Sequence, residues 1–325
     1  MIAGVFTRPN LLMLAQTPPK MRKPRPLRPG ATIGIVSPAS PIAPEKLAGM
    51  ESRLKQAGYH VVYGRHALKA TDYLAGSDAE RAEDLNWAFL DPDIDAVLCS
   101  RGGYGCARLM PLLKLDLFAS SGKLFLGYSD LTTLHLGLLR RGLATVYAPM
   151  CVSFHVEREP WVYESFFNAL AGQNTIIGPA RGCTLVPGMA EGRVTGGCLC
   201  LLTDSIGTPD PLETDGKILL IEDVDENPHR VDAMLTHLIL SGLVERCAGI
   251  VVGEMTNTDL QQDALIGGRP WREIVRERLE PLGKPTIYDF PFGHMKTMLT
   301  LPLGLNARLD ATQGTLTYLE PLCEE

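Results

Sequence analysis

The stretch KLFLGYSDLTTLHL, residues 123–136, decides the fold and suggests a function. An apolar run ends at Gly127, Ser129 follows, and the next residues have a helical pattern. A serine on a sharp strand-to-helix turn projects its hydroxyl clear of the sheet, close to backbone N–H groups, which suits a nucleophile in acyl transfer. A serine is also a common helix N-cap after a strand, so this stretch alone leaves both roles open.

Strands alternate with amphipathic helices on the N-terminal side of this stretch. The predicted strands are 32–36, 59–63, 94–99 and 124–127, and the predicted helices are 45–57, one opened by the Ser77/Glu80 capping box and ending at 89, and one ending near 113. This alternation predicts a parallel sheet flanked by helices. Ligands bind such sheets at the carboxyl ends of the strands, where Ser129 lies.

A glycine-rich segment, RGGYG at 101–105, follows another predicted strand. Glycines let backbone N–H groups approach a ligand oxygen without an intervening side chain. A tight turn explains the same pattern. A phosphate loop is disfavoured because no Gly-Lys-Ser/Thr follows.

The second half supplies an acid and a histidine. A strand is predicted at 217–221 with Glu222 at its carboxyl end, a helix at 228–241, and a loop at 290–294 that ends in His294. Each residue alone also fits a solvated acid or an ordinary loop histidine. Together with Ser129 they supply a nucleophile, an orienting carboxylate and a general base. The chain order matches α/β-hydrolases, but Leu131 replaces the glycine that follows their nucleophile, so the order does not settle the architecture.

Length and charge limit the class of protein. The 325 residues favour two domains, and the net charge of −6 provides no basic field for nucleic acid or anionic lipid. Neither Cys-x-x-Cys nor His-Glu-x-x-His occurs, so spacing supports no zinc site, and the eight scattered cysteines fit a reducing compartment.

The N-terminus reads as an irregular basic leader, residues 1–26. It is a poor signal peptide, and no stretch of the sequence approaches a membrane span of about 18 apolar residues. We therefore expect a cytoplasmic protein with no membrane partner. The expected divisions are an N-terminal α/β domain at 27–165, a linker at 166–188 and a C-terminal domain at 189–325.

Six motifs in order resemble the LD-carboxypeptidases, the muramoyltetrapeptide carboxypeptidases whose family includes the microcin-immunity peptidases. The motifs are RGGYG (101–105), GYSDLT (127–132), GG (196–197), GTP (207–209), IEDV (221–224) and GH (293–294) followed by LPLG (301–304). The resemblance covers about residues 29–319. It implies a parallel α/β N-terminal domain that holds the serine, and a β-rich α/β C-terminal domain that supplies the acid and the histidine, with the active site in the cleft between them.

The resemblance implies a triad of Ser129, His294 and Glu222, with no metal and no cofactor. The oxyanion hole would use the backbone N–H groups of Asp130 and Gly103. The implied reaction removes the terminal D-alanine from cytoplasmic murein tetrapeptides during cell-wall recycling, and the implied assembly is a homodimer.

Substrate-binding residues are expected in the glycine-rich segment. Arg101 is a candidate bidentate partner for the free carboxylate of the leaving residue, although packing against the sheet is an alternative. Gly102 and Tyr104 are the other candidates.

The chain departs from the family pattern in two places. Cys198 replaces an asparagine and His229 replaces a tyrosine, and both changes bear on specificity. Cys198 is interpreted as a small packed residue rather than a second nucleophile. His135 and His229 are alternative bases, and His135 is disfavoured because it lies on the helix after Ser129.

Three functions remain open at this point. The first is a serine LD-carboxypeptidase for murein peptides. The second is a hydrolase of peptidyl- or aminoacyl-nucleotides, which aromatic residues able to stack on a base would favour. The third is a non-catalytic murein-fragment binder, which has no need of a nucleophile and a base.

Overall fold

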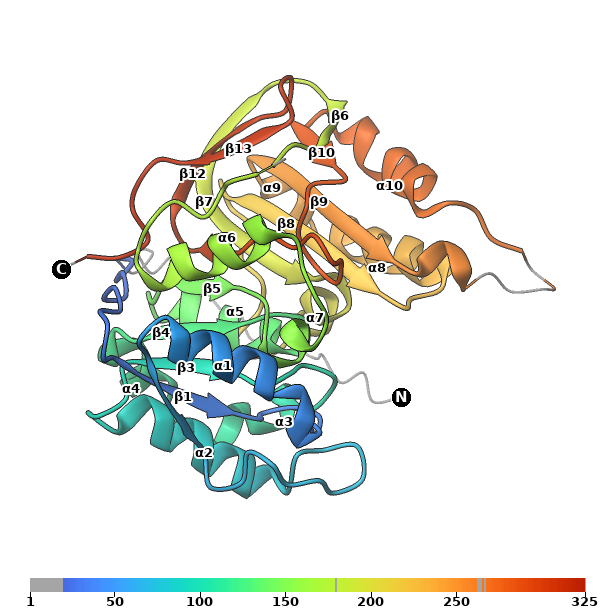
Figure 1. The fold of residues 1–325 in the computed structure, drawn as a ribbon. Helices are drawn as coiled ribbons and strands as arrows, with labels where there is room; N and C mark the ends of the chain where they lie inside the picture. Colours follow the sequence, from blue (N-terminus) through green and yellow to red (C-terminus); the bar gives the residue numbers. More distant parts are fainter. Residues whose placement is uncertain (1–19, 179, 262–264, 266, 325) are drawn as a thin grey trace, which may run out of the picture.

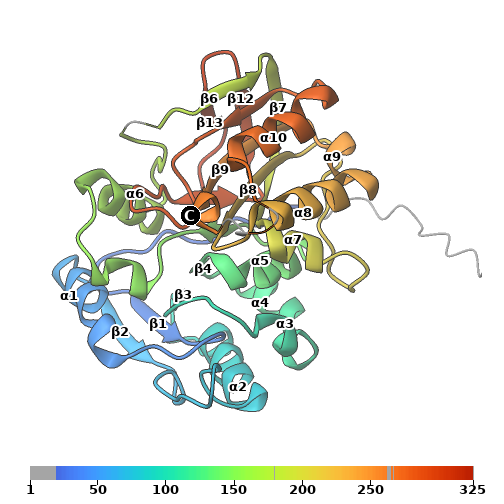
Figure 2. The same ribbon diagram turned by 90° about the vertical axis from the view of Figure 1, so that its right-hand side faces the viewer.

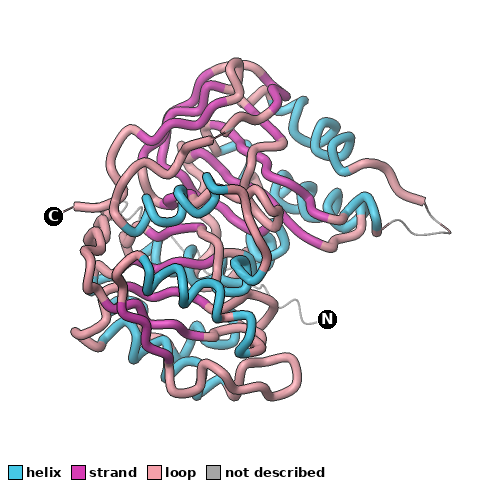
Figure 3. Tube along the Cα trace, in the orientation of Figure 1, coloured by secondary structure: helices cyan, strands magenta, loops and turns pink. Residues whose placement is uncertain are grey.

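The computed structural model describes residues 20–178, 180–261, 265 and 267–324. Its described part contains a six-stranded sheet of order β11-β5-β4-β3-β1-β2 and a seven-stranded sheet of order β13-β12-β7-β8-β9-β10-β6 (Figure 1). Helices flank the strands of both sheets (Figure 3). The predicted two-domain α/β fold is confirmed, with a parallel N-terminal sheet and a mixed, curled C-terminal sheet.

Five strands of the first sheet are parallel. They are β1 (Thr32–Val36), β2 (His60–Tyr63), β3 (Ala96–Cys99), β4 (Leu124–Gly127) and β5 (Thr145–Tyr147). Every residue of β3, β4 and β5 is buried, as expected for a sheet covered on both faces. The sixth strand, β11 (Leu301–Leu303), comes from the far end of the chain and pairs antiparallel with β5.

Six α-helices belong to the described N-terminal half. They are α1 (Ala48–Gln56), α2 (Asp78–Leu90), α3 (Cys106–Leu109), α4 (Leu115–Ser121), α5 (Thr132–Arg140) and α6 (Pro160–Leu170). The predicted capping box opens α2: the Glu80 N–H donates to Ser77 Oγ at 3.3 Å, and the Ser77 N–H donates to the Glu80 carboxylate at 3.0 Å. The helix expected to end near residue 113 stops at Leu109, because Pro111 cannot continue an α-helix and sits instead in a 3₁₀ turn.

The long strand β7 (Met189–Cys198) organises the second sheet. Its first half pairs antiparallel with β12 (Asn306–Asp310), and its second half pairs parallel with β8 (Ile218–Val224). The sheet continues through β9 (Gly249–Thr256), β10 (Thr286–Tyr288) and β6 (Cys183–Val186), and β13 (Thr315–Tyr318) lies at the other edge. Because β8 runs three residues further than predicted, Glu222 lies inside the strand rather than after it.

Four helices gather on one side of this sheet (Figure 2). They are α7 (Leu199–Asp204), α8 (Pro228–Leu240), α9 (Leu243–Arg246) and α10 (Trp271–Leu279). Leu235 of α8 and Ile274 of α10 share one buried apolar cluster with Ile221 and Val252 of the sheet. This cluster fixes the strand that carries Glu222.

The expected leader, linker and C-terminal domain each contain residues that pair with a sheet. Residues 1–19 of the expected leader lie outside the described residues, whereas Arg22 pairs with Leu143, and its guanidinium donates to the carbonyls of Ala119 and Ser120. The expected linker, 166–188, contains the end of α6 and strand β6, which had no clear sequence pattern and is held by pairing with β10. Strand β11, from the expected C-terminal domain, completes the first sheet.

One buried apolar cluster extends through both halves. It joins Leu131 and Tyr147 of the N-terminal half to Val194, Phe292 and Leu303 of the C-terminal half. The two halves are therefore packed together around the carboxyl ends of β4 and β8. In the described part of the chain, no helix is long and apolar enough to cross a membrane.

Candidate active site

Ser129 lies on the connection between β4 and α5. It begins a 3₁₀ turn, Ser129–Leu131, and its φ of +68° falls in the left-handed region that residues other than glycine rarely adopt. Such conformations cost free energy and cluster at functional sites. The strand-turn-helix expected from the sequence is present, and its turn is strained at the serine itself.

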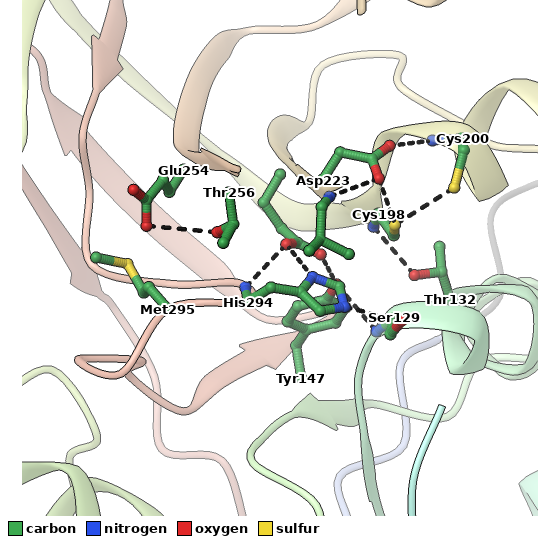
Figure 4. A network of polar contacts seen from close by, with 12 residues as sticks. Ser129, Thr132, Tyr147, Cys198, Cys200, Asp223, Glu254, Thr256, His294 and Met295 are labelled. Carbon is green, nitrogen blue, oxygen red and sulfur yellow. Dashed lines mark hydrogen bonds and ion pairs between the residues drawn. The ribbon is translucent and has the colours of Figure 1, made fainter. Parts of the chain in front are cut away.

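The structure brings Ser129, His294 and Glu222 together from three separate elements; Ser129 and His294 are labelled in Figure 4. Ser129 Oγ lies 2.9 Å from His294 Nε2, and His294 Nδ1 lies 2.7 Å from Glu222 Oε2. The same Glu222 oxygen accepts the backbone N–H of His294 at 3.1 Å. Glu222 is 0% exposed, so its charge acts on the imidazole with little screening by solvent. This is the geometry of a nucleophile, a base and an orienting acid.

Tyr147 is a site residue that the sequence analysis missed. Its hydroxyl donates to Glu222 Oε1 and accepts the backbone N–H of Ser129 at 3.2 Å. It therefore links the Glu222 carboxylate to the backbone of Ser129. Tyr147 ends β5, the strand beside β4, so the rule that functional groups gather at strand carboxyl ends could have found it.

Glu222 changes the proton affinity of His294. Burial lowers the pKa of His294, but the charge of Glu222 and its hydrogen bond to the ring raise it by more, so the net shift is upward. The neighbouring Tyr128 ring packs 4.8 Å from the imidazole, centroid to centroid. The histidine is therefore held in one orientation and made a stronger base.

A glycine permits the close approach of His294 to the acid. Gly293 has a φ of +101°, and a Cβ at this position would collide with the side chain of Glu222. Glycine alone fits both the backbone conformation and the space. Glycine before His294 thus leaves the space that the Glu222 side chain occupies.

The glycine-rich segment lies against the nucleophile. A Cβ on Gly102 would come within 3.0 Å of Ser129 Oγ and 3.4 Å of the Asp130 nitrogen, whereas a Cβ on Gly103 would collide with Ser40. Gly102 is therefore the glycine in direct contact with Ser129. The oxyanion-hole roles of the Gly103 and Asp130 N–H groups stay predictions.

The polar side chains of this segment hold the loops in place. The Asp130 carboxylate accepts the Cys106 N–H at 2.8 Å, and the Arg101 guanidinium donates to the carbonyls of Pro41 and Gly102, each at 3.2 Å. Tyr104 is exposed and its ring lies 5.9 Å from that of Tyr73. Arg101 thus braces the loop, while Tyr104 is open to a ligand.

The two alternative histidines have other surroundings. His135 is buried and its ring bonds Thr145 Oγ1 at 2.8 Å and the Gly127 carbonyl at 2.9 Å. Burial lowers its pKa to about 4. His229 is exposed in the first turn of α8. His294 is the histidine that contacts Ser129.

Cys198 is buried at the end of β7. Its backbone N–H donates to Thr132 Oγ1 at 3.1 Å, on the helix that follows Ser129. The contact with Cys200, burial and nearby carboxylates hold the pKa of the Cys198 thiol well above its usual range, which disfavours a nucleophilic thiolate. Among the residues that the structure describes, Cys198, Cys200 and Asp223 form one group able to hold a metal ion.

Comparison with known proteins identifies the family. Residues 33–148 match the LD-carboxypeptidase N-terminal domain and residues 191–309 match the LD-carboxypeptidase C-terminal domain. The chain is 33% identical to the probable murein peptide carboxypeptidase of Bacillus subtilis, over 90% of this chain and 93% of that protein. It is 29% identical to the murein tetrapeptide carboxypeptidase of Pseudomonas aeruginosa, over 86% and 94%.

A solved structure shows the same fold. MccF in complex with glutamyl sulfamoyl guanosine superposes with a TM-score of 0.83 at 27% identity, covering 93% of this chain and 100% of that one. MccF is a microcin C7 self-immunity protein. With both domain models matched in order along the chain, this protein belongs to the LD-carboxypeptidase family.

Proposed function

We propose that this protein is a serine LD-carboxypeptidase that releases the terminal D-alanine from murein tetrapeptides during cell-wall recycling. The observation that carries the proposal is the continuous hydrogen-bonded chain from Ser129 Oγ through His294 to buried Glu222. Two relatives named as murein peptide carboxypeptidases support the substrate class. A cytoplasmic location and a homodimer remain predictions of the family resemblance.

Acyl transfer follows from the triad. Ser129 Oγ attacks the carbonyl carbon next to D-alanine while His294 Nε2 takes its proton, and Glu222 stabilises the imidazolium that forms. His294 then gives this proton to the leaving amine, so D-alanine departs and an acyl-enzyme on Ser129 remains. Water attacks the acyl carbon while His294 takes its proton; the bond from this carbon to Ser129 Oγ then breaks, His294 returns the proton to Ser129, and the shortened peptide leaves.

Backbone donors would stabilise the tetrahedral oxyanion. The Asp130 N–H follows the nucleophile directly, and a second donor comes from the glycine-rich segment at Gly102–Gly103. Loss of one such donor typically costs a factor of about 10²–10³ in rate. The absence of a Cβ at Gly102 leaves room for the reacting carbonyl beside Ser129.

The free carboxylate of D-alanine needs a cationic partner. Arg101 lies one residue before Gly102, and its guanidinium already bonds two backbone carbonyls. We propose that it contributes positive charge to this carboxylate while bracing the loop. Tyr104, which is exposed beside the same segment, would line the substrate's path.

A second candidate substrate is a peptidyl- or aminoacyl-nucleotide. The exposed Tyr73–Tyr104 pair offers aromatic faces on which a nucleobase can stack, and the MccF similarity favours this class. Trp271, by contrast, is buried and unavailable for stacking. A non-catalytic binder is disfavoured, because pure binding gives no reason to strain Ser129 against His294.

The test is D-alanine release from L-Ala-γ-D-Glu-meso-diaminopimelate-D-Ala. We expect wild type and the exposed control Ser52→Ala to release it, and Ser129→Ala to lose a factor on the order of 10⁶ in kcat. Release that survives in Ser129→Ala would overturn the triad. No release by wild type, with cleavage of a glutamyl sulfamoyl nucleoside, would support the second candidate. Cleavage of neither, without Ser129 labelling by a fluorophosphonate, would support a binder.

A further inference from the structure

Cys198, Cys200 and Asp223 converge beside the catalytic strand although the proposed reaction does not use them. Cys198 Sγ lies 3.5 Å from Cys200 Sγ and 3.5 Å from Asp223 Oδ1 (Figure 4). The three donor atoms all lie within 4.8 Å of one another. They come from the end of β7, the start of α7 and the carboxyl end of β8, so the fold rather than the local sequence assembles them.

The spacing of these atoms fits a tetrahedral metal ion. With Zn–S bonds of about 2.3 Å and Zn–O bonds of about 2.0 Å, two sulfurs lie about 3.8 Å apart and a sulfur and an oxygen about 3.5 Å apart. Both observed separations of 3.5 Å are close to these edges. Small shifts of the side chains would therefore place all three atoms around one ion.

The backbone positions the donors in advance. Asp223 accepts the Cys200 N–H and the Val224 N–H, each at 2.8 Å, and the Cys198 N–H is bonded to Thr132. These bonds fix the carboxylate and the backbone of both cysteines. Orienting contacts of this kind support metal ligands in proteins.

The surrounding charge favours a cation. The charges that shift the pKa values of the three groups are all negative: the Cys200 thiolate and the carboxylates of Asp204, Glu222, Asp223 and Glu226. A bound cation would offset this accumulation of negative charge, and Cys200 is only half-buried, so the group is not sealed from solvent.

We propose that Cys198, Cys200 and Asp223 form a binding site for a thiophilic divalent cation, with Zn²⁺ as the physiological case. The two thiolates and one carboxylate supply three ligands, and water supplies the fourth. Each thiol that binds the metal loses its proton to solvent, so binding releases up to two protons. The site is separate from the triad and takes no part in the proposed acyl transfer.

The test is a Cd²⁺ titration of the metal-stripped full chain in a phosphine reductant, followed by thiolate-to-metal charge-transfer absorption, with Zn²⁺ as competitor. We expect saturation at one equivalent, displacement by Zn²⁺, and tighter binding as the pH rises. Cys200→Ser should weaken Cd²⁺ binding by more than about 100-fold, because it removes a direct ligand. Cys198→Ser should do the same.

Two matched variants separate this site from others. Cys183→Ser removes an exposed cysteine outside the group, and His294→Ala removes the catalytic histidine; both should keep the one-equivalent signal. If Cys198→Ser fails to fold, half-buried Cys200 alone carries the test. Binding that is absent, that survives in Cys200→Ser, that disappears in Cys183→Ser or His294→Ala, or that does not change with pH would overturn the proposal.

Discussion

Two histidines lie close to the end of β4, and the difference between their surroundings distinguishes a buried structural histidine from the proposed general base. The His135 ring contacts a neutral hydroxyl and a carbonyl, and burial lowers its pKa to about 4. The His294 ring contacts the buried carboxylate of Glu222, which raises its pKa despite burial. Both rings are buried or nearly so, but only the one with a charged partner is prepared to accept a proton from Ser129. The partner, rather than the burial, distinguishes the two.

The largest expected difference between the two histidines appears when each ring is removed in turn. We expect His294→Ala to lower kcat by a factor on the order of 10⁶, because the triad acts as a unit. We expect His135→Gln to keep kcat within about tenfold while lowering the free energy of unfolding by about 1–3 kcal/mol, since buried hydrogen bonds are lost. Steady-state D-alanine release and urea unfolding measure the two effects. A large loss of kcat in a folded His135→Gln would contradict the assignment.

Removing the charge of Glu222 tests what makes His294 the base. Glu222→Gln keeps the shape of the side chain, and we expect kcat to fall by about 10⁴. In wild type, kcat/KM should rise with pH through a His294 pKa above its usual 6.5, because the neutral imidazole is the base. In Glu222→Gln this limb should move to lower pH, since burial is then opposed only by the smaller effects of the Asp223 and Asp225 charges. A pH–rate limb at the same position in both proteins would assign it to another group.

A substitution of Tyr147 tests how much the hydrogen bond to Glu222 contributes to the rate. Tyr147→Phe removes the hydroxyl that donates to Glu222 and accepts the Ser129 N–H. A hydrogen bond to a charged group contributes about 1.5–3 kcal/mol, so we expect kcat to fall by about 10–100-fold. Tyr63→Phe, a half-buried tyrosine bonded to Glu51 far from the triad, is the control and should leave kcat unchanged. Equal effects from the two variants would show that Tyr147 has no special role.

The smallest expected effect is the contribution of the two histidines to the pH dependence of stability, which does not involve kcat. Because the folded-state pKa of His135 is about 4 against 6.5 when unfolded, the unfolded chain binds a proton that the folded chain does not between these pH values. Stability is therefore lost as the pH falls through 6.5, by about 3 kcal/mol at pH 4 from this group. His294 has the opposite sign: its contribution is fully present below pH 6.5 and is lost as the pH rises through its raised folded-state pKa.

The measurement for His135 is urea unfolding of wild type and His135→Gln between pH 7 and pH 4. Subtracting the free energy of unfolding of His135→Gln from that of wild type at each pH removes the carboxylate contributions that the two proteins share. We expect the difference in free energy of unfolding, wild type minus His135→Gln, to fall by about 3 kcal/mol over this range, so that the advantage of wild type vanishes or reverses at pH 4. A difference that is independent of pH would mean that the buried ring is not held neutral.

The sequence could predict the elements and residues that are marked by a local pattern. The β-branched and apolar runs predicted β1, β3 and β4, and the Ser77/Glu80 pair predicted the start of α2. The motifs around Ser129, Glu222 and His294 pointed to three residues that the structure brings together, although Glu222 lies inside β8 rather than after it. Their catalytic roles stay predictions.

What the sequence could not predict depends on pairing across the chain. In the sequence, Tyr147 looks like one more apolar residue of a buried strand. Only the pairing of β5 with β4 brings its hydroxyl to Ser129, which follows β4. Asp223 lies 25 residues from Cys198, so no ligand spacing connects them until β7 pairs with β8. Strand β11 is three residues long, and its antiparallel partner β5 lies more than 150 residues earlier.

The pairing of β11 with β5 has a mechanical consequence. The loop that carries His294 leaves the second sheet at β10 and enters the first sheet at β11, so it is anchored on both sides of the active site. A hinge motion that separated the halves would have to break the β11–β5 ladder or withdraw the histidine from Ser129. The two halves produced as separate chains would leave an exposed edge on β5.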